Sequence, residues 1–187
     1  EYYEEEKKEE NKPKDIAKLN ITLEKAKYVY DGEAKEPVVT VKAEEVMLEE
    51  GKQYKVEYAN NENVGIATVT ISGTGEYTGT VLKKFTILPK GNKLTKTTLT
   101  KKGLKLNWKK QTEQTDGYQI QYSTESKFTK GFTKIKLINK NKSASYSITK
   151  LKNGKYYIRI RTYKVVDGKK YYSSWSKVKV VKVKPIK

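Results

Sequence analysis

Short runs in which apolar and polar residues alternate recur along this sequence, and most of them end at turns that contain glycine. A two-residue period is typical of strands with one buried face. Turn signals such as Asp31-Gly32, Asp116-Gly117 and Asp167-Gly168 follow these runs, and short strands broken in this way predict an antiparallel sandwich. The clearest runs are Leu19–Ile21–Leu23, Tyr54–Val56–Tyr58, Ala67–Val69–Ile71, Leu104–Leu106–Trp108, Tyr118–Ile120–Tyr122 and Tyr156–Ile158–Ile160. We therefore expect an all-β chain, with residues 43–50 open between a helical turn and a short strand.

The charge of the chain changes abruptly near its middle. Residues 1–90 carry 14 Lys and 18 Asp+Glu, a net charge of −4, whereas residues 91–187 carry 26 Lys+Arg and 4 Asp+Glu, a net charge of +22. The change falls at Leu88-Pro89-Lys90-Gly91-Asn92, and Pro and Gly this close together are typical of a linker. We predict two tandem immunoglobulin-like antiparallel sandwiches, residues 16–89 and 90–187.

The first 15 residues have a different character. Six Glu and two Lys lie within residues 1–10, and so little apolar content predicts a flexible tail over residues 1–15. Because the chain begins at Glu1 without a leader, we expect it to be a fragment of a longer protein.

Composition excludes several kinds of chemistry. The chain has no Cys and no His, which removes disulfides, thiol and Ser-His catalysis and the usual zinc ligands. It has no apolar run of the length that a spanning helix needs. Acidic residues are few and scattered in residues 91–187, and the Gly73-Thr74-Gly75 segment lacks the following Lys-Ser/Thr of a phosphate loop. We expect no catalytic residues, no metal site, no cofactor and no transmembrane segment.

Residues 16–89 carry a motif in which glycines, asparagines and tyrosines fall in register. Its members are Tyr30-Asp31-Gly32, Leu48, Gly51, Tyr54-x-Val56-x-Tyr58, Asn60-Asn61, Gly65-x-Ala67-x-Val69-x-Ile71, Gly73-x-Gly75-x-Tyr77-x-Gly79 and Phe85-x-Ile87. The order resembles the bacterial immunoglobulin-like repeat of large surface proteins from Gram-positive bacteria, especially clostridia and gut anaerobes.

Residues 92–184 resemble a fibronectin type III domain in the Lys-rich form of the same surface proteins. The residues that carry this resemblance are Leu106-x-Trp108, Gly117-Tyr118-x-Ile120-x-Tyr122-Ser123, Leu151-x-x-Gly154-x-Tyr156-x-Ile158-x-Ile160-x-Thr162 and Tyr172-Ser173-Ser174-Trp175-Ser176. The resemblance implies structural roles for Trp108, Tyr118 and Tyr156, with the Tyr156 hydroxyl bonded to nearby backbone. Leu151 and Tyr156 are five residues apart where six is commoner. We expect Trp108 in the core and Trp175 outside it.

The chain has only two arginines, Arg159 and Arg161, against 38 lysines. Both alternate with Ile158 and Ile160, so they should face away from the core. A guanidinium stacks on aromatic faces better than an ammonium does. We therefore predict a structural cation–π ladder of Trp175, Arg159 and Arg161, a feature of some fibronectin-type domains.

Three functions are compatible with this surface. The expected one is a non-catalytic spacer or interaction module of a secreted or wall-associated bacterial surface protein. It would be a monomer that takes part in adhesion and associates with anionic wall polymers, host glycans or proteins. A basic domain for nucleic acid or another polyanion is the first alternative, which the scarcity of Arg argues against. A carbohydrate-binding accessory module is the second, with Tyr157, Tyr163 and Tyr171 as outward, ligand-facing aromatics.

Overall fold

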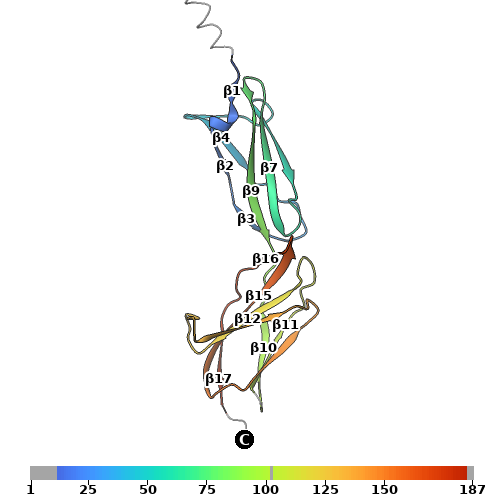
Figure 1. The fold of residues 1–187 in the computed structure, drawn as a ribbon, viewed down its shortest axis with the longest axis vertical. Coiled ribbons are helices and arrows are strands. Elements are labelled where there is room, and N and C mark those ends of the chain that lie inside the picture. The colour runs from blue at the N-terminus through green and yellow to red at the C-terminus, as the bar shows by residue number, and fades with distance from the viewer. Residues whose placement is uncertain (1–11, 102, 185–187) are drawn as a thin grey trace, which may run out of the picture. The chain divides into compact units, whose positions relative to one another are not determined.

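The computed structural model describes residues 12–101 and 103–184, and these residues form two compact units (Figure 1). The first contains the residues up to Tyr28 and Gly32–Ile87. The second contains Leu88 onward together with Val29–Asp31. The described residues contain strands and one short 3-10 helix but no α-helix. The all-β prediction is therefore confirmed.

The first unit is built from two main sheets. One has the order β2-β4-β5 and the other β3-β9-β7-β6, while β1 pairs in parallel with β8. Its elements are β1 (Lys14–Asp15), η1 (Ile16–Lys18), β2 (Asn20–Leu23), β3 (Lys27–Val29), β4 (Val39–Ala43), β5 (Val46–Met47), β6 (Tyr54–Ala59), β7 (Gly65–Gly73), β8 (Tyr77–Thr78) and β9 (Thr80–Leu88). Within residues 43–50, β5 is a strand, which decides between the two alternatives left open there.

The expected tail over residues 1–15 is too long at its C-terminal end. Lys14 and Asp15 pair with Tyr77 and Thr78, and Asp15 caps η1 by accepting a hydrogen bond from the Ala17 N–H at 2.9 Å. Ile16, the first apolar residue after the acidic segment, is fully buried. The rest of the predicted tail, residues 1–11, lies outside the described residues.

The second unit is also a two-sheet sandwich. One sheet has the order β10-β11-β14. The other has the order β13-β12-β15-β16, and β17 also pairs with β15. Its strands are β10 (Leu94–Thr100), β11 (Gly103–Trp108), β12 (Gly117–Ser123), β13 (Thr133–Ile138), β14 (Ser145–Thr149), β15 (Gly154–Val166), β16 (Lys169–Tyr172) and β17 (Lys179–Val183).

Alternation along β11, β12 and β15 builds the core of this unit. The side chains on one face of each strand are buried, among them Leu104, Leu106, Tyr118, Ile120, Ile158 and Ile160, all at 0% exposure. Trp108 is 3% exposed, and its ring packs on Tyr118 with centroids 5.2 Å apart. Burial raises the pKa of the Tyr118 hydroxyl, which accepts a hydrogen bond from the Gln111 N–H and donates to the Asn141 carbonyl.

Replacing Trp108 with Ala should destabilise the second unit by about 3–5 kcal/mol, because the cavity left by a large ring adds to the lost transfer free energy. Urea unfolding followed by far-UV circular dichroism measures this change, and the fluorescence of Trp175 reports on the same unit. An unchanged urea midpoint would show that Trp108 contributes nothing to the core.

Candidate functional site

The outer face of the β13-β12-β15 sheet, together with the segment after β16, holds both arginines of the second unit and several of its aromatic side chains. Gln121 lies opposite Arg159, and Gln119 lies opposite Arg161. Directly paired residues share one face of a sheet, so all four project away from the buried isoleucines. Each arginine Nε donates to the Oε1 of its glutamine at 2.8 Å. These bonds fix the planes of the two guanidinium groups.

Three aromatic rings alternate with the two guanidiniums to form the ladder. The Arg159 Cζ lies 4.0 Å from the ring centroid of Phe128 and 4.6 Å from that of Trp175. The Arg161 Cζ lies 4.2 Å from Trp175 and 3.9 Å from Tyr172. The order is therefore Phe128, Arg159, Trp175, Arg161, Tyr172. Every guanidinium face meets an aromatic ring, which is the arrangement that a ring quadrupole favours.

The segment after β16 holds Trp175 in place through two serines. The Ser173 Oγ accepts a hydrogen bond from the Thr162 N–H, and the Ser176 Oγ accepts one from the Ile160 N–H, each at 3.0 Å. The N–H groups of the two serines donate in return to the carbonyls of Thr162 and Ile160. The segment is thus fastened to β15 on both sides of Trp175, where the sequence places the ring between the two arginines.

Burial lowers the pKa of both Arg159 and Arg161 from the ordinary value of a guanidinium. That value is so high that both groups stay charged in a protein. The Nε donor and both faces of each guanidinium are already used inside the unit. The ladder therefore works as a structural brace.

The structure contradicts the outward, ligand-facing position that was expected for two of the three tyrosines. Tyr163 is 3% exposed and Tyr171 is 8% exposed. Tyr163 lies on the outer face, but it is opposite Gly117, whose missing side chain leaves room for the ring. Its hydroxyl donates to the Asn139 Oδ1 at 2.7 Å. Tyr171 pairs with Lys164, and the residue that shares the outer face with Tyr163 is Tyr172. Only Tyr157 is partly exposed among the three.

The corner role expected for Tyr156 is also absent. Its ring is 8% exposed and belongs to the core cluster. Within the described residues, its hydroxyl makes no hydrogen bond to backbone. The five-residue spacing from Leu151 agrees with this difference.

Sequence reasoning missed four members of the brace: Phe128, Tyr172, Gln119 and Gln121. The glutamines alternate with the core residue Ile120, and this two-residue period indicates that their side chains lie on the outer face. Phe128 lies in the loop between β12 and β13 with a φ of 54°, a conformation that a bulky residue rarely adopts. No local pattern indicated that this loop would return to the sheet.

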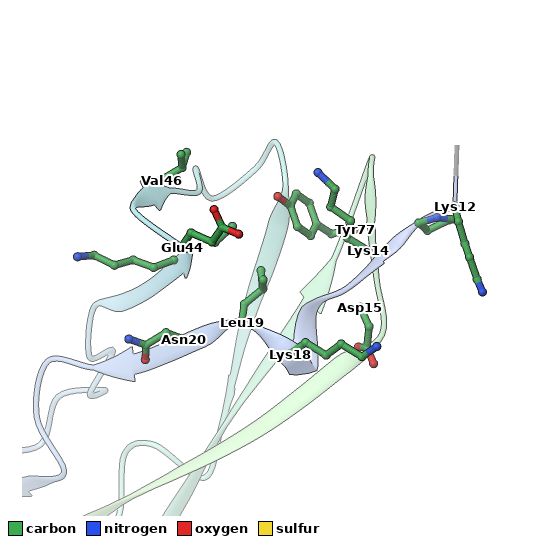
Figure 2. Close-up of a pocket in the computed structure, with 12 residues that line it drawn as sticks. Lys12, Lys14, Asp15, Lys18, Leu19, Asn20, Glu44, Val46 and Tyr77 are labelled. Carbon is green, nitrogen blue, oxygen red and sulfur yellow. The ribbon is translucent and has the colours of Figure 1, made fainter. Parts of the chain in front are cut away.

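An open pocket of about 1110 Å³ lies near η1 in the first unit. It is lined by Lys12, Pro13, Lys14, Asp15, Lys18, Leu19, Asn20, Lys42, Ala43, Glu44, Val46 and Tyr77. Figure 2 shows that Lys14, Glu44 and Tyr77 line it from three separate segments of the chain. Lysines and carboxylates are mixed there, and Asp15 is used as a helix cap. The pocket contains none of the predicted site residues.

The described part of the chain contains neither a candidate metal site nor a candidate membrane-spanning helix. No group of three or more Asp or Glu side chains there could hold a metal ion. Residues 12–101 and 103–184 also contain no helix long and apolar enough to cross a membrane.

Replacing Arg161 with Lys should destabilise the second unit by about 1–2 kcal/mol, because an ammonium cannot fill a flat slot between two rings. Urea unfolding followed by far-UV circular dichroism gives the change. Lys105→Gln, at an exposed position on the other sheet, serves as the control and should stay within about 0.5 kcal/mol of the parent. Equal midpoints for Arg161→Lys and the parent would mean that the ladder contributes no stability.

A second charged contact ties the loop before β12 to β15. Asp116 accepts a hydrogen bond from the Lys164 Nζ and another from the Val165 N–H, both at 2.8 Å. Burial raises the pKa of Asp116, but the two hydrogen bonds and the Lys164 charge outweigh it, so the net pKa is lowered. The carboxylate therefore stabilises the fold above the unfolded pKa of about 3.9 and loses this effect as pH falls through the folded value.

Replacing Asp116 with Asn should consequently lower the free energy of unfolding at pH 7 by up to about 1 kcal/mol, since the pair is partly exposed. The difference between parent and variant should shrink as pH falls toward about 2. Urea unfolding across this pH range measures it. A difference in the free energy of unfolding that does not change with pH would rule out the charge of Asp116 as its cause.

Comparisons with known proteins bear on the second unit. Residues 89–179 match the family described as Fibronectin type III domain. No curated protein matches the chain in sequence. Among solved structures, the crystal structure of the chicken CNTN1 FN1-FN3 domains aligns with a TM-score of 0.42 and 14% sequence identity, covering 92% of this chain and 68% of that chain. Residues 89–179, the span that is similar to the fibronectin type III family, include the whole ladder.

Proposed function

We propose that the chain is a non-catalytic pair of spacer and interaction modules from a secreted or wall-associated surface protein. In this proposal the second unit attaches to anionic polymers of a Gram-positive cell wall, such as teichoic acid, and the first unit extends the chain as a bacterial immunoglobulin-like repeat. Fibronectin type III domains are typically modules for interaction or spacing, and the similarity of residues 89–179 to this family supports a module of this kind.

The observation that carries the proposal is the unneutralised positive charge of the second unit. Among the described residues from Leu94 onward, every lysine except Lys164 is exposed. Lys164 is also the only one of these lysines in an ion pair with a carboxylate. The other lysines are spread over both sheets and their loops. A charge of this size attracts polyanions without a shaped site.

The first unit lacks such a surplus. Of the net −4 in residues 1–90, all comes from residues 1–11, which carry six Glu and two Lys, while residues 12–90 carry 12 Lys and 12 Asp+Glu. A balanced surface gives no long-range attraction for a polyanion. The interaction is therefore assigned to the second unit.

The ladder argues against a nucleic-acid reader. Bidentate phosphate contacts favour arginine, and both arginines of the chain are held by glutamine and by aromatic rings. The charge that remains available is lysine. This favours attraction by charge density over recognition of a phosphate pattern.

Binding of the chain to teichoic acid should be strong at low salt and largely vanish by a few tenths molar NaCl, because exposed charges are screened beyond about 8 Å at 0.15 M salt. Exchanging Lys96, Lys105 and Lys130 together for Gln should weaken binding. The matched change of Lys27, Lys55 and Lys84 in the first unit should have little effect. Isothermal titration calorimetry over a salt series measures both.

Two results would contradict the proposal. One is no binding of the parent chain at any salt concentration. The other is an equal loss of affinity for the two triple variants, which would show that the charge of the second unit is not the cause.

A further inference from the structure

Tyr157 and Tyr163 are aromatic residues on the outer face of the β15 sheet that are not part of the ladder. Tyr157 is partly exposed, and within the described residues its side chain has no hydrogen bond, ring contact or cation partner. Phe128, Trp175 and Tyr172 are occupied by the arginines, and Tyr163 is buried. Tyr157 is therefore the aromatic group of this face that is still free to contact another molecule.

The neighbours of Tyr157 on this face are cationic and apolar. Tyr157 lies opposite Val180, which is 55% exposed, and Lys155 lies opposite Lys182 in the next row on the same side. Two residues along a strand separate the rows by about 6.6 Å. We call Lys155, Tyr157, Val180 and Lys182 the Tyr157 patch.

The two lysines of the patch form an unfavourable pair. Like charges directly opposite each other on paired strands destabilise a sheet, and neither β15 nor β17 contains an Asp or Glu. A carboxylate bound between the two ammonium groups would turn this repulsion into attraction. The patch is thus complementary to an anion.

The patch places an apolar aromatic surface and a lysine pair side by side on one face of the sheet. A tyrosine ring beside a valine offers an apolar surface on which the C–H face of a sugar ring can lie, while the lysine pair meets a carboxylate. The outer face of the β10-β11-β14 sheet provides a contrast. Its exposed side chains, such as Lys96, Thr98, Lys105 and Ser147, include lysines but no aromatic ring.

We infer that the Tyr157 patch is a subsite for one charged sugar unit of an anionic polysaccharide whose rings carry carboxylates. The inference rests on the proposed function, because the charge of the second unit brings the polymer to the surface and the patch then favours polymers that contain sugar rings. The lysine pair holds the carboxylate of the same sugar unit whose ring lies on Tyr157, so the patch favours a polymer that carries both groups on one unit.

The test compares two polymers with equal numbers of carboxylates, polygalacturonate with sugar rings and polyglutamate without them. Isothermal titration calorimetry on the whole chain at low salt gives both affinities. Tyr157→Leu keeps the apolar bulk and removes the ring, so it should lower the affinity for polygalacturonate about fivefold to tenfold, the size of one aromatic contact. The affinity for polyglutamate should not change. Tyr157→Phe should behave like the parent with both polymers.

The lysines are tested by the ratio of the two affinities. Exchanging Lys155 and Lys182 for Gln should reduce the preference for polygalacturonate. The matched exchange of Lys96 and Lys105 should weaken the binding of both polymers equally and leave the ratio of the two affinities unchanged. Circular dichroism establishes that each variant is folded.

The outcomes separate the two proposals. If the parent binds both polymers and Tyr157→Leu changes neither affinity, or lowers both equally, the subsite is wrong and the charge-driven function stands. If the parent binds neither these polymers nor teichoic acid, the proposed function fails and the subsite falls with it.

Discussion

Strand β15 is the element on which the second unit depends, because one of its faces belongs to the core and the other carries the arginines of the ladder. Its buried side supplies Ile158 and Ile160 to the core, and its outer side supplies Arg159 and Arg161 to the ladder. It also pairs with β12, β16 and β17. A register slip of one residue would bury two guanidiniums and expose two isoleucines. The alternation along this one strand therefore fixes both the core and the brace.

The sequence carried enough information for the fold class and for the side of the sheet on which the arginines lie. Both follow from a period of two residues, which is a local property. Tyr163 and Tyr171 show where this reasoning ends. The outer face alone does not expose Tyr163, because Gly117 on the neighbouring strand leaves space for its ring. Tyr171 and Tyr172 exchange roles because the hairpin register, and not the sequence of β16, decides which of them faces outward.

Phe128 is a harder case because no strand period applies to it. It comes from a loop, has a positive φ, and reaches Arg159 at 4.0 Å. The cost of the backbone conformation is local, whereas the contact that offsets it lies 31 positions later in the sequence. Long-range compensation of this kind is not visible in a single sequence. The tail boundary shows the same limit, since Lys14 and Asp15 become a strand only by pairing with Tyr77 and Thr78.

In the proposed function, the two kinds of cation in this chain divide structural and interactive tasks. Guanidinium is suited to a fixed, flat position between rings, and both arginines are used there. Ammonium is a strongly hydrated point charge on a flexible stem, so the exposed lysines keep their charge available to a partner while imposing little geometry on it. Selectivity for a polyanion must then come from another group beside the lysines. On the outer face of β15 and β17, Tyr157 is the side chain in a position to supply it.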